Sequence, residues 1–234
     1  MFLQLDQLAQ PRCVNHMSSA GHIRFVVTND FHHDNPANDA WMETAFKQIA
    51  TTENADFCFE LGDLANHGTP ESLATMKRLS ALAGMPFYPA IGNHDLDDQG
   101  DAGNYTAVFP DRLNYTFTQN GWQFVVIDST DGVIWQDSSI RDKTFAWLDA
   151  TLPTLDSDAP TILATHFPLA ADVTFAPINT EQVLTRFDKL NLRGVFCGHY
   201  HANHDGTKGK GYLVCDGSAD GEITRTFVPF AGSA

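Results

Sequence analysis

Residues 87–95 read FYPAIGNHD, an apolar run that stops abruptly at Gly92, Asn93, His94 and Asp95. Four other apolar runs of the chain end in the same way, in short segments that carry Asp or His. These segments are Asp30-Phe31-His32, Gly62-Asp63, Thr165-His166 and Gly198-His199-Tyr200-His201. Ligands gather at the carboxyl ends of strands in open α/β sheets, so we expect these five segments to converge on one sheet edge.

Strand and helix patterns alternate through the first half of the chain. β-branched, aromatic and other apolar runs predict strands at 23–28, 57–61 and 87–91. Apolar residues at helical spacing predict a helix over 40–50. Thr69, Pro70 and Glu71 form a helix start, with a capping hydroxyl, then Pro in the first turn, then an acid. This second helix is expected to run to about 82 and to end at Gly84.

The second half mixes a hairpin with further strand–helix units. Residues 95–112 are rich in Asp and Gly and predict a long loop. Asn120-Gly121 is a strong hairpin signal between strands at 115–118 and 124–127. Asn179 and Gln182 resemble a capping box for a helix that ends near Leu190. We also predict a helix at 140–152 and strands at 161–165, 192–197, 212–215 and 224–228.

The expected organisation is an N-terminal arm over residues 1–21 and a single α/β domain over 22–234, with more than one sheet. Cys58, Cys197 and Cys215 lie in apolar, strand-like runs and are expected to be reduced packing residues. No secretion signal and no apolar run of membrane-spanning length is visible. A cytoplasmic protein is therefore the expectation.

The charge balance limits the partners that we expect. The chain carries 29 acidic and 14 basic residues, for a formal net charge of −15, and it has no stretch rich in Lys or Arg. Duplex nucleic acid and anionic membranes are therefore not expected partners. A small molecule is the expected ligand, bound by a monomer or a homodimer.

The five segments together have the composition of a two-metal site. They supply three oxygen ligands and four imidazoles, with His94 left aside. One carboxylate that bridges two ions would complete two four-ligand sets, as in two-metal hydrolases. Oxygen and imidazole ligands without a thiolate suit Mn, Fe, Zn, Co or Ni, and the sequence does not choose among these ions.

The order and spacing of the segments resemble the calcineurin-like metallophosphoesterase superfamily over about residues 23–215. The family signature is Asp-x-His, Gly-Asp, Gly-Asn-His-Asp/Glu, His and Gly-His-x-His, and this chain has every element of it. The resemblance implies a four-layer α/β/β/α sandwich of two mixed sheets that holds two divalent metals. One ion would be bound by Asp30, His32, Asp63 and His201. The other would be bound by Asp63, Asn93, His166 and His199.

The resemblance also implies a mechanism, in which a metal-bridging hydroxide attacks the phosphoester and His94 assists the leaving group. Asp95 could orient His94 or could hold the following loop. His33, His67 and His204 lie beside the motifs and could line the pocket. Trp135, Phe167 and Phe175 could stack on a base or aryl group, or could be packing residues.

The motifs are most similar in style to those of class III cyclic nucleotide phosphodiesterases. Two departures are Thr165-His166-Phe167-Pro168, where that branch has His-His-Pro-Pro, and the short stretch of 33 residues after His201. The function expected first is a phosphodiesterase acting on small phosphoesters, with cyclic nucleotides among them. The alternatives are a phosphomonoesterase for sugar or nucleotide phosphates and a non-catalytic metal-binding scaffold module.

Overall fold

A computed structural model describes residues 2–3, 20–170, 173–201 and 210–231 of the chain. The strands form two five-stranded sheets. The first sheet contains, in spatial order, β10 (Ile223–Pro229), β9 (Gly211–Gly217), β2 (Ile23–Thr28), β3 (Phe57–Glu60) and β4 (Phe87–Pro89). The second contains β1 (Phe2–Leu3), β8 (Asn191–Cys197), β7 (Pro160–Thr165), β6 (Trp122–Val126) and β5 (Tyr115–Gln119).

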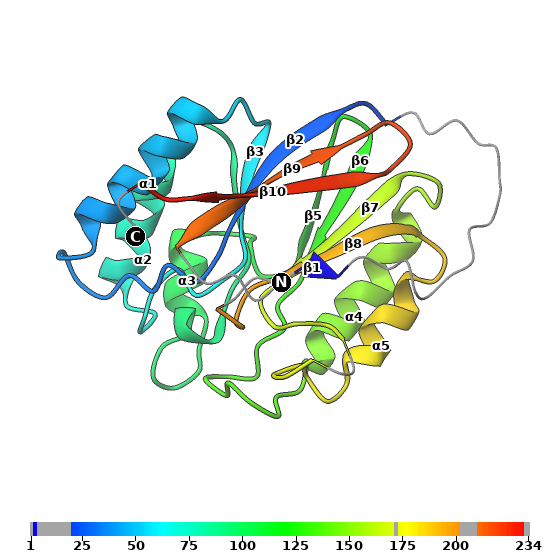
Figure 1. Cartoon of the computed structure of the whole chain (residues 1–234). Helices are drawn as coiled ribbons and strands as arrows, with labels where there is room; N and C mark the ends of the chain where they lie inside the picture. Colours follow the sequence, from blue (N-terminus) through cyan, green and yellow to red (C-terminus); the bar gives the residue numbers. More distant parts are fainter. Residues whose placement is uncertain (1, 4–19, 171–172, 202–209, 232–234) are drawn as a thin grey trace.

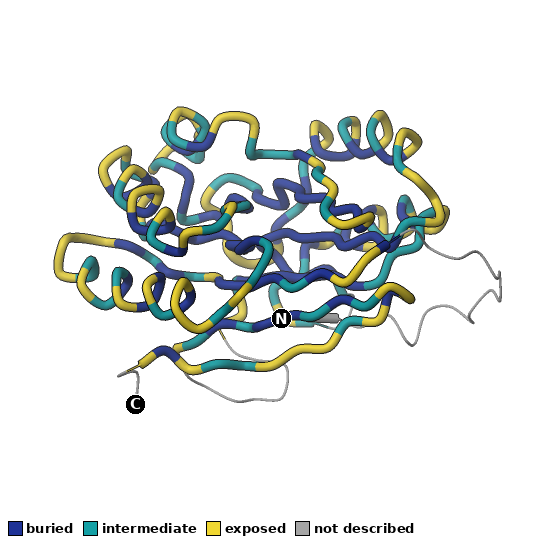
Figure 2. The backbone as a smooth tube through the Cα atoms, turned by 90° about the horizontal axis from the view of Figure 1, so that it is seen from above, coloured by how far each residue is buried: buried dark blue, intermediate teal, exposed yellow. Residues whose placement is uncertain are grey.

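Helices cover the outer face of each sheet (Figure 1). The helices α1 (Asp39–Thr52) and α2 (Pro70–Ser80) lie on the side of the first sheet, and α4 (Asp142–Thr151) and α5 (Thr180–Leu184) on the side of the second. Figure 2 shows buried backbone through the middle of the molecule and helical turns at the periphery that alternate between buried and exposed. The predicted four-layer α/β/β/α sandwich of two mixed sheets is confirmed.

The directions of the strands explain why the motif loops share one edge. Strands β2, β3 and β4 run parallel to one another, and so do β6, β7 and β8. Strands β9, β5 and β1 run antiparallel to β2, β6 and β8, respectively. The five predicted motifs follow the carboxyl ends of β2, β3 and β4 in one sheet and of β7 and β8 in the other.

The two sheets pack on each other through aromatic side chains. The two-residue period of β3 turns Phe57 and Phe59 towards the second sheet and Cys58 towards the helices. The ring of Phe57 lies 5.2 Å from that of Phe25 and 5.1 Å from that of Phe124 across the interface. Complete burial of each such side chain contributes about 1.5–3 kcal/mol. Because this layer is close-packed, it fixes the strand ends that carry the motifs.

The start and end of α2 follow the predicted signals. The Thr69 side chain accepts a hydrogen bond from the backbone N–H of Ser72, and Pro70 occupies the first helical position. A 3₁₀ turn, Ala81–Ala83, extends the helix, and Gly84 ends it in the left-handed region with φ of 69°. Glycine adopts this conformation without the steric penalty of a Cβ.

The predicted hairpin and core cysteines are also present. Asn120 and Gly121 have φ of 49° and 79° between the paired residues Gln119 and Trp122, as a type I′ turn requires. The three strand cysteines, Cys58, Cys197 and Cys215, are buried in the core.

Two predictions of local structure are wrong. Part of the segment 95–112 is helical, because α3 (Gly103–Val108) lies within it. The side chain of Tyr105 in α3 is completely buried, and its hydroxyl donates to the carbonyl of Pro89 at 3.2 Å, so tertiary packing overrides a weak helix propensity. Asn179 makes no capping bond to α5, because its side chain exchanges two hydrogen bonds with the backbone of Ile140 instead, each 2.9 Å long.

Residues 2–3 belong to the segment predicted to be an N-terminal arm. Phe2 and Leu3 pair with Phe196 and Val195, so they form the edge strand of the second sheet. Residues 4–19, with Cys13 and His16, lie outside the described residues. The division into an arm over 1–21 and one domain over 22–234 therefore stays a prediction.

Candidate metal centre

All seven residues predicted to bind metal lie on loops at one edge of the sandwich. Four of them, Asp30, His32, Asp63 and Asn93, follow the strands β2, β3 and β4 of the first sheet. The other three, His166, His199 and His201, follow β7 and β8 of the second. Six of the seven form two groups of converging ligand atoms, and Asp63 belongs to both groups.

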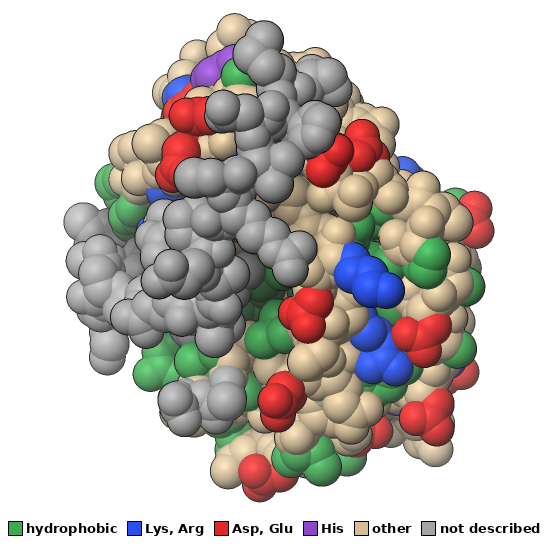
Figure 3. All heavy atoms as spheres, turned by 90° about the vertical axis from the view of Figure 1, so that its right-hand side faces the viewer, with side chains coloured by type: hydrophobic (Ala, Val, Ile, Leu, Met, Phe, Trp, Pro, Cys, Tyr) green, Lys and Arg blue, Asp and Glu red, His purple; other side chains and the backbone are tan. Residues whose placement is uncertain are grey.

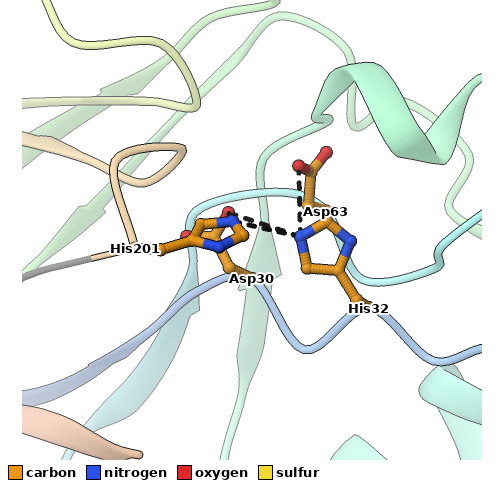
Figure 4. Close-up of side chains that lie close together, drawn as sticks. All are labelled: Asp30, His32, Asp63 and His201. Carbon is orange, nitrogen blue, oxygen red and sulfur yellow. Dashed lines mark hydrogen bonds and ion pairs between the residues drawn. The ribbon is translucent and has the colours of Figure 1, made fainter. Parts of the chain in front are cut away.

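The first group contains Asp30, His32, Asp63 and His201 (Figure 4). The Nε2 atom of His201 lies 3.1 Å from Oδ1 of Asp30. The Nε2 atom of His32 lies 3.6 Å from Oδ2 of Asp63 and 3.2 Å from Nε2 of His201. Two imidazole nitrogens and two carboxylates thus face one small space, which is an arrangement suited to a divalent cation.

The second group contains Asp63, His166 and His199. The Nε2 atom of His166 lies 3.2 Å from Oδ2 of Asp63 and 3.1 Å from Nδ1 of His199. The same oxygen, Oδ2 of Asp63, therefore lies near both groups. A shared carboxylate is what the sequence-based hypothesis of a two-metal site requires.

The far sides of two imidazoles are held in the orientation that a metal ligand needs. His166 donates through Nδ1 to the carbonyl of Leu61 at 2.8 Å. His199 donates through Nε2 to the carbonyl of Trp135 at 2.9 Å. A carbonyl oxygen can only accept, so each ring presents its other nitrogen as a lone pair to the cluster in its neutral form.

Asn93 supplies a further test of whether these residues fit a metal ion. Its side chain is 3% exposed, and Oδ1 is buried without a hydrogen-bond partner in the described part of the chain. A buried amide oxygen without a partner is unfavourable by about 1–3 kcal/mol. A cation beside it would remove that penalty, so Asn93 fits the predicted role of a neutral oxygen ligand.

Burial and neighbouring charges shift the pKa values of the candidate ligands. Burial raises the pKa of the Asp63 carboxyl, but the neighbouring His166, His32 and His94 together lower it more, and the net pKa lies below its ordinary value. Burial lowers the pKa of His166, whereas Asp63 and Asp30 raise it to about 9. Burial and the charge of His166 lower the pKa of His199 to about 4. The balance keeps Asp63 anionic at neutral pH, as a bridging ligand must be.

The backbone at the cluster adopts an unusual conformation. Five of the candidate ligands have positive φ, between 48° and 66°: Asp30, His32, Asp63, His199 and His201. Such conformations are uncommon outside glycine and gather at functional sites, where the surrounding structure enforces them. The strand ends thus turn sharply enough to present successive side chains to one centre.

His94 lies beside the cluster. The backbone N–H of His94 donates to Oδ1 of Asp63, and Nδ1 of His94 contacts the carbonyl of Asn66, each at 2.9 Å. The ring of His94 meets the ring of His32 edge-on at 4.7 Å. His94 is therefore placed to reach a group bound at the cluster.

Asp95 is completely buried, and its contacts are with backbone rather than with His94. Its carboxylate accepts from the backbone N–H groups of Asp63, Ala65 and Gly92, each at 2.9 Å. Burial and the charge of Asp63 raise the pKa of Asp95, against the lowering effect of these N–H groups. The contacts favour the second of the two predicted roles, that of holding a loop.

The other histidines and aromatic residues that the sequence suggested for the pocket differ in where they lie. His33 is buried and pairs with Asp39 at 2.9 Å, whereas His67 lies on the wall of a pocket beside His94. His204 is outside the described residues. Phe167 is completely buried, but Trp135 is 57% exposed.

Three backbone carbonyls that orient site histidines were missed by the sequence analysis. They belong to Leu61, Asn66 and Trp135. Any residue type carries a carbonyl, so no sequence signal could have identified them.

A family model described as calcineurin-like phosphoesterase matches residues 23–203. The chain belongs to this family. A 3′,5′-cyclic-nucleotide phosphodiesterase from Nostoc sp. is 28% identical over 155 residues, which are 62% of this chain and 56% of the relative. A probable glycerophosphodiester phosphodiesterase from Arcobacter nitrofigilis is 26% identical over 160 residues, with the same two coverages. The chain thus spans about half the length of these curated relatives.

The fold has solved counterparts. A purple acid phosphatase, PPD1 of yellow lupin seeds, superposes with a TM-score of 0.61 over 94% of this chain and 53% of that one, at 12% identity. This likeness concerns the fold alone. In the described part of the chain, no helix is both long enough and apolar enough to span a membrane.

Proposed function

We propose that the chain is a metal-dependent phosphodiesterase that acts on small phosphoesters, with cyclic nucleotides among the candidates. One observation carries the proposal: Oδ2 of Asp63 lies between two converging groups of ligand atoms. The buried oxygen of Asn93, which has no partner among the described residues, supports its proposed role as the fourth ligand of the second group. Both curated relatives are named as phosphodiesterases, which favours a diester over a monoester.

The proposed ligand sets are those expected from the sequence. One ion would be held by Asp30, His32, Asp63 and His201, and the other by Asp63, Asn93, His166 and His199. Two bound divalent ions would supply an activated water and would neutralise charge on the phosphoryl oxygens. The oxygen and imidazole donors suit Mn, Fe, Zn, Co or Ni.

His94 is the proposed general acid. The carbonyl of Asn66 holds its Nδ1, so Nε2 is the atom available to protonate a departing alcohol oxygen. Because the backbone of His94 is also bonded to Asp63, the acid and the bridging carboxylate keep a fixed spacing. Asp95 is proposed to be a positioning residue, which acts indirectly by holding the loops that carry Asp63 and Asn93.

A small anionic substrate and a cytoplasmic location complete the proposal. With a net charge of −15, the chain offers no general attraction to polyanions, so a phosphoester must be bound through local contacts. Figure 3 shows one face, on which acidic side chains are scattered and basic ones are few. We propose no duplex nucleic acid or membrane partner, and a monomer or a homodimer.

The test compares the hydrolysis of bis-p-nitrophenyl phosphate with that of p-nitrophenyl phosphate by manganese-loaded protein. Wild type should prefer the diester and should lose activity after dialysis against a chelator. Asn93→Ala should lose both activity and one manganese ion per chain, whereas His94→Ala should keep the metals and lose turnover. His22→Ala, which changes a histidine paired with Asp216 outside the cluster, is the matched control.

The outcome separates the candidate functions. Preference for the monoester would favour the phosphomonoesterase, which is the alternative within the same family. Stoichiometric metal binding without turnover of either ester would favour the non-catalytic scaffold. Equal activity of wild type and Asn93→Ala would contradict the two-metal site itself.

A further inference from the structure

A pocket with a volume of about 260 Å³ opens beside the candidate metal centre. Part of its lining comes from the loops after β3 and β4, with Asn66, His67, Asn93, His94 and Leu96. Asp97 and Asp98 continue the second of these loops, and Val133 and Trp135 come from another. The pocket therefore shares Asn93, a proposed metal ligand, and the neighbouring His94 with the candidate metal centre.

One wall of the pocket is apolar and is anchored to the centre. Trp135 and Val133 are 57% and 50% exposed, which is unusual for large apolar side chains. The carbonyl of Trp135 accepts from the candidate ligand His199, and its ring lies 5.8 Å from that of Phe175. Contiguous exposed apolar side chains that are rimmed by polar residues are typical of ligand-binding grooves.

Another part of the pocket lining carries negative charge, from Asp97 and Asp98. The side chain of Asp97 is fixed, because its Oδ1 accepts from the backbone N–H groups of Gln99 and Asp101, each at 2.9 Å. Asp98 is exposed and makes no hydrogen bond or ion pair with any described residue. None of the described residues that line the pocket is Lys or Arg. Among the described lining residues, the polar side chains besides Asp97 and Asp98 are those of Asn66, His67, Asn93 and His94, so the pocket has two carboxylates and no permanent cation.

The two walls are held at close range by a contact between glycines. A Cβ added at Gly100, which has φ of 75°, would lie 3.0 Å from the Cα of Gly132. Only glycine allows this approach without displacement of a loop. The distance between the aromatic wall and the acidic wall is thus a property of the fold.

We propose that this pocket binds the alcohol portion of a phosphoester whose alcohol carries a positive charge, such as a quaternary ammonium alcohol. An aromatic face attracts a cation, and the carboxylates of Asp97 and Asp98 add to this attraction. The inference rests on the proposed function, because the metal centre must hold the phosphoryl group while the pocket holds the alcohol.

Two ligands of nearly equal shape can show how much the positive charge alone contributes to binding. Phosphocholine and 3,3-dimethylbutyl phosphate differ in one atom, a quaternary nitrogen against a quaternary carbon. Calorimetric titration of the manganese-loaded protein measures the affinity of each, and inorganic phosphate measures the metal centre alone. We expect phosphocholine to bind about tenfold more tightly than its neutral counterpart.

Variants assign this preference to the two walls. Trp135→Leu should reduce the ratio of the two affinities by about threefold to tenfold. Asp98→Asn should reduce it by about twofold to fivefold, with the affinity for inorganic phosphate unchanged or slightly higher. Asp101→Asn is the matched control, because it removes a charge from the same loop outside the pocket and should leave the ratio unchanged.

The possible results are distinct. Equal affinities in wild type, or tighter binding of the neutral compound, would overturn the inference while leaving the proposed function intact, provided that bis-p-nitrophenyl phosphate is hydrolysed. Binding of inorganic phosphate but of neither ester would overturn it too. Absence of both phosphate binding and hydrolysis would refute the proposed function, and this inference with it.

Discussion

Replacement of Asp95 by Asn distinguishes a residue that holds the metal-binding loops from one that orients His94. The Asp95 carboxylate accepts three backbone hydrogen bonds, from Asp63, Ala65 and Gly92. These N–H groups belong to the loops that follow β3 and β4, which carry the candidate ligands Asp63 and Asn93. The side chain of Asp95 makes no hydrogen bond to His94 among the described residues.

The magnitude follows from the geometry. An Asn whose oxygen replaces Oδ2 keeps the bonds from Asp63 and Gly92, but its NH₂ group then faces the N–H of Ala65. One buried N–H is left without an acceptor, which lowers the free energy of unfolding by about 1–3 kcal/mol. Outer residues that orient metal ligands change metal affinity by about 10–100-fold when they are mutated, and we expect manganese binding to weaken within that range.

The assay is calorimetric titration of manganese, with urea unfolding of the metal-free protein as the second readout. Asp101→Asn is again the control, because among the described residues its Oδ1 accepts only one exposed backbone N–H, that of Gly103. A variant with unchanged manganese affinity and unchanged stability but a reduced kcat would refute the reasoning. That result would restore the alternative in which Asp95 orients His94.

Three further predictions concern other parts of the fold. Burial raises the pKa of Glu60 well above its ordinary value, so the stability that its protonated form contributes is complete below about pH 4.5 and is lost as pH rises towards the folded-state pKa. Glu60→Gln should therefore gain stability over metal-free wild type by about 1.4 kcal/mol per pH unit above that point. The prediction is contradicted if the urea midpoints of the two proteins differ by the same amount at every pH from 4 to 8. A Cβ at Gly62, where φ is 95°, would lie 2.7 Å from Nδ1 of His166, so Gly62→Ala should abolish metal binding in calorimetry while Gly84→Ala, where nothing lies within 4 Å, should keep it. Thr69→Ala should lower the unfolding free energy by about 1 kcal/mol in urea, because α2 loses its cap, and Thr69→Ser should largely restore it.

Local signals in the sequence predicted most of the helices, strands and turns. The hairpin at Asn120-Gly121 and the start of α2 at Thr69 depend on residues whose conformational preferences are strong enough to act without tertiary help. The same holds for the apolar strands, because a short continuous apolar run indicates a strand that is buried on both faces, as β3, β6 and β7 are. The convergence of the candidate ligands then follows from parallel strands that end at one edge.

The parts that could not be predicted depend on contacts between distant residues. The helix α3 forms because Tyr105 finds a buried acceptor in Pro89, sixteen residues earlier in the chain. Asn179 has a good capping side chain, but the backbone of Ile140 competes for it. The carbonyls that orient His166 and His199 come from Leu61 and Trp135, and the sequence marks neither position.

The left-handed backbone at the candidate ligands narrows which donor residues the centre can use. Each of the five positions with positive φ disfavours most side chains by about 1 kcal/mol or more. Among residues that bind divalent metals, Asp, Asn and His tolerate this conformation best. Glutamate or cysteine could coordinate an ion equally well, yet neither is suited to such a turn. At these five positions two independent conditions therefore limit the residue type, the coordination preference of the ion and the torsion angle of the backbone, and only a residue that satisfies both fits.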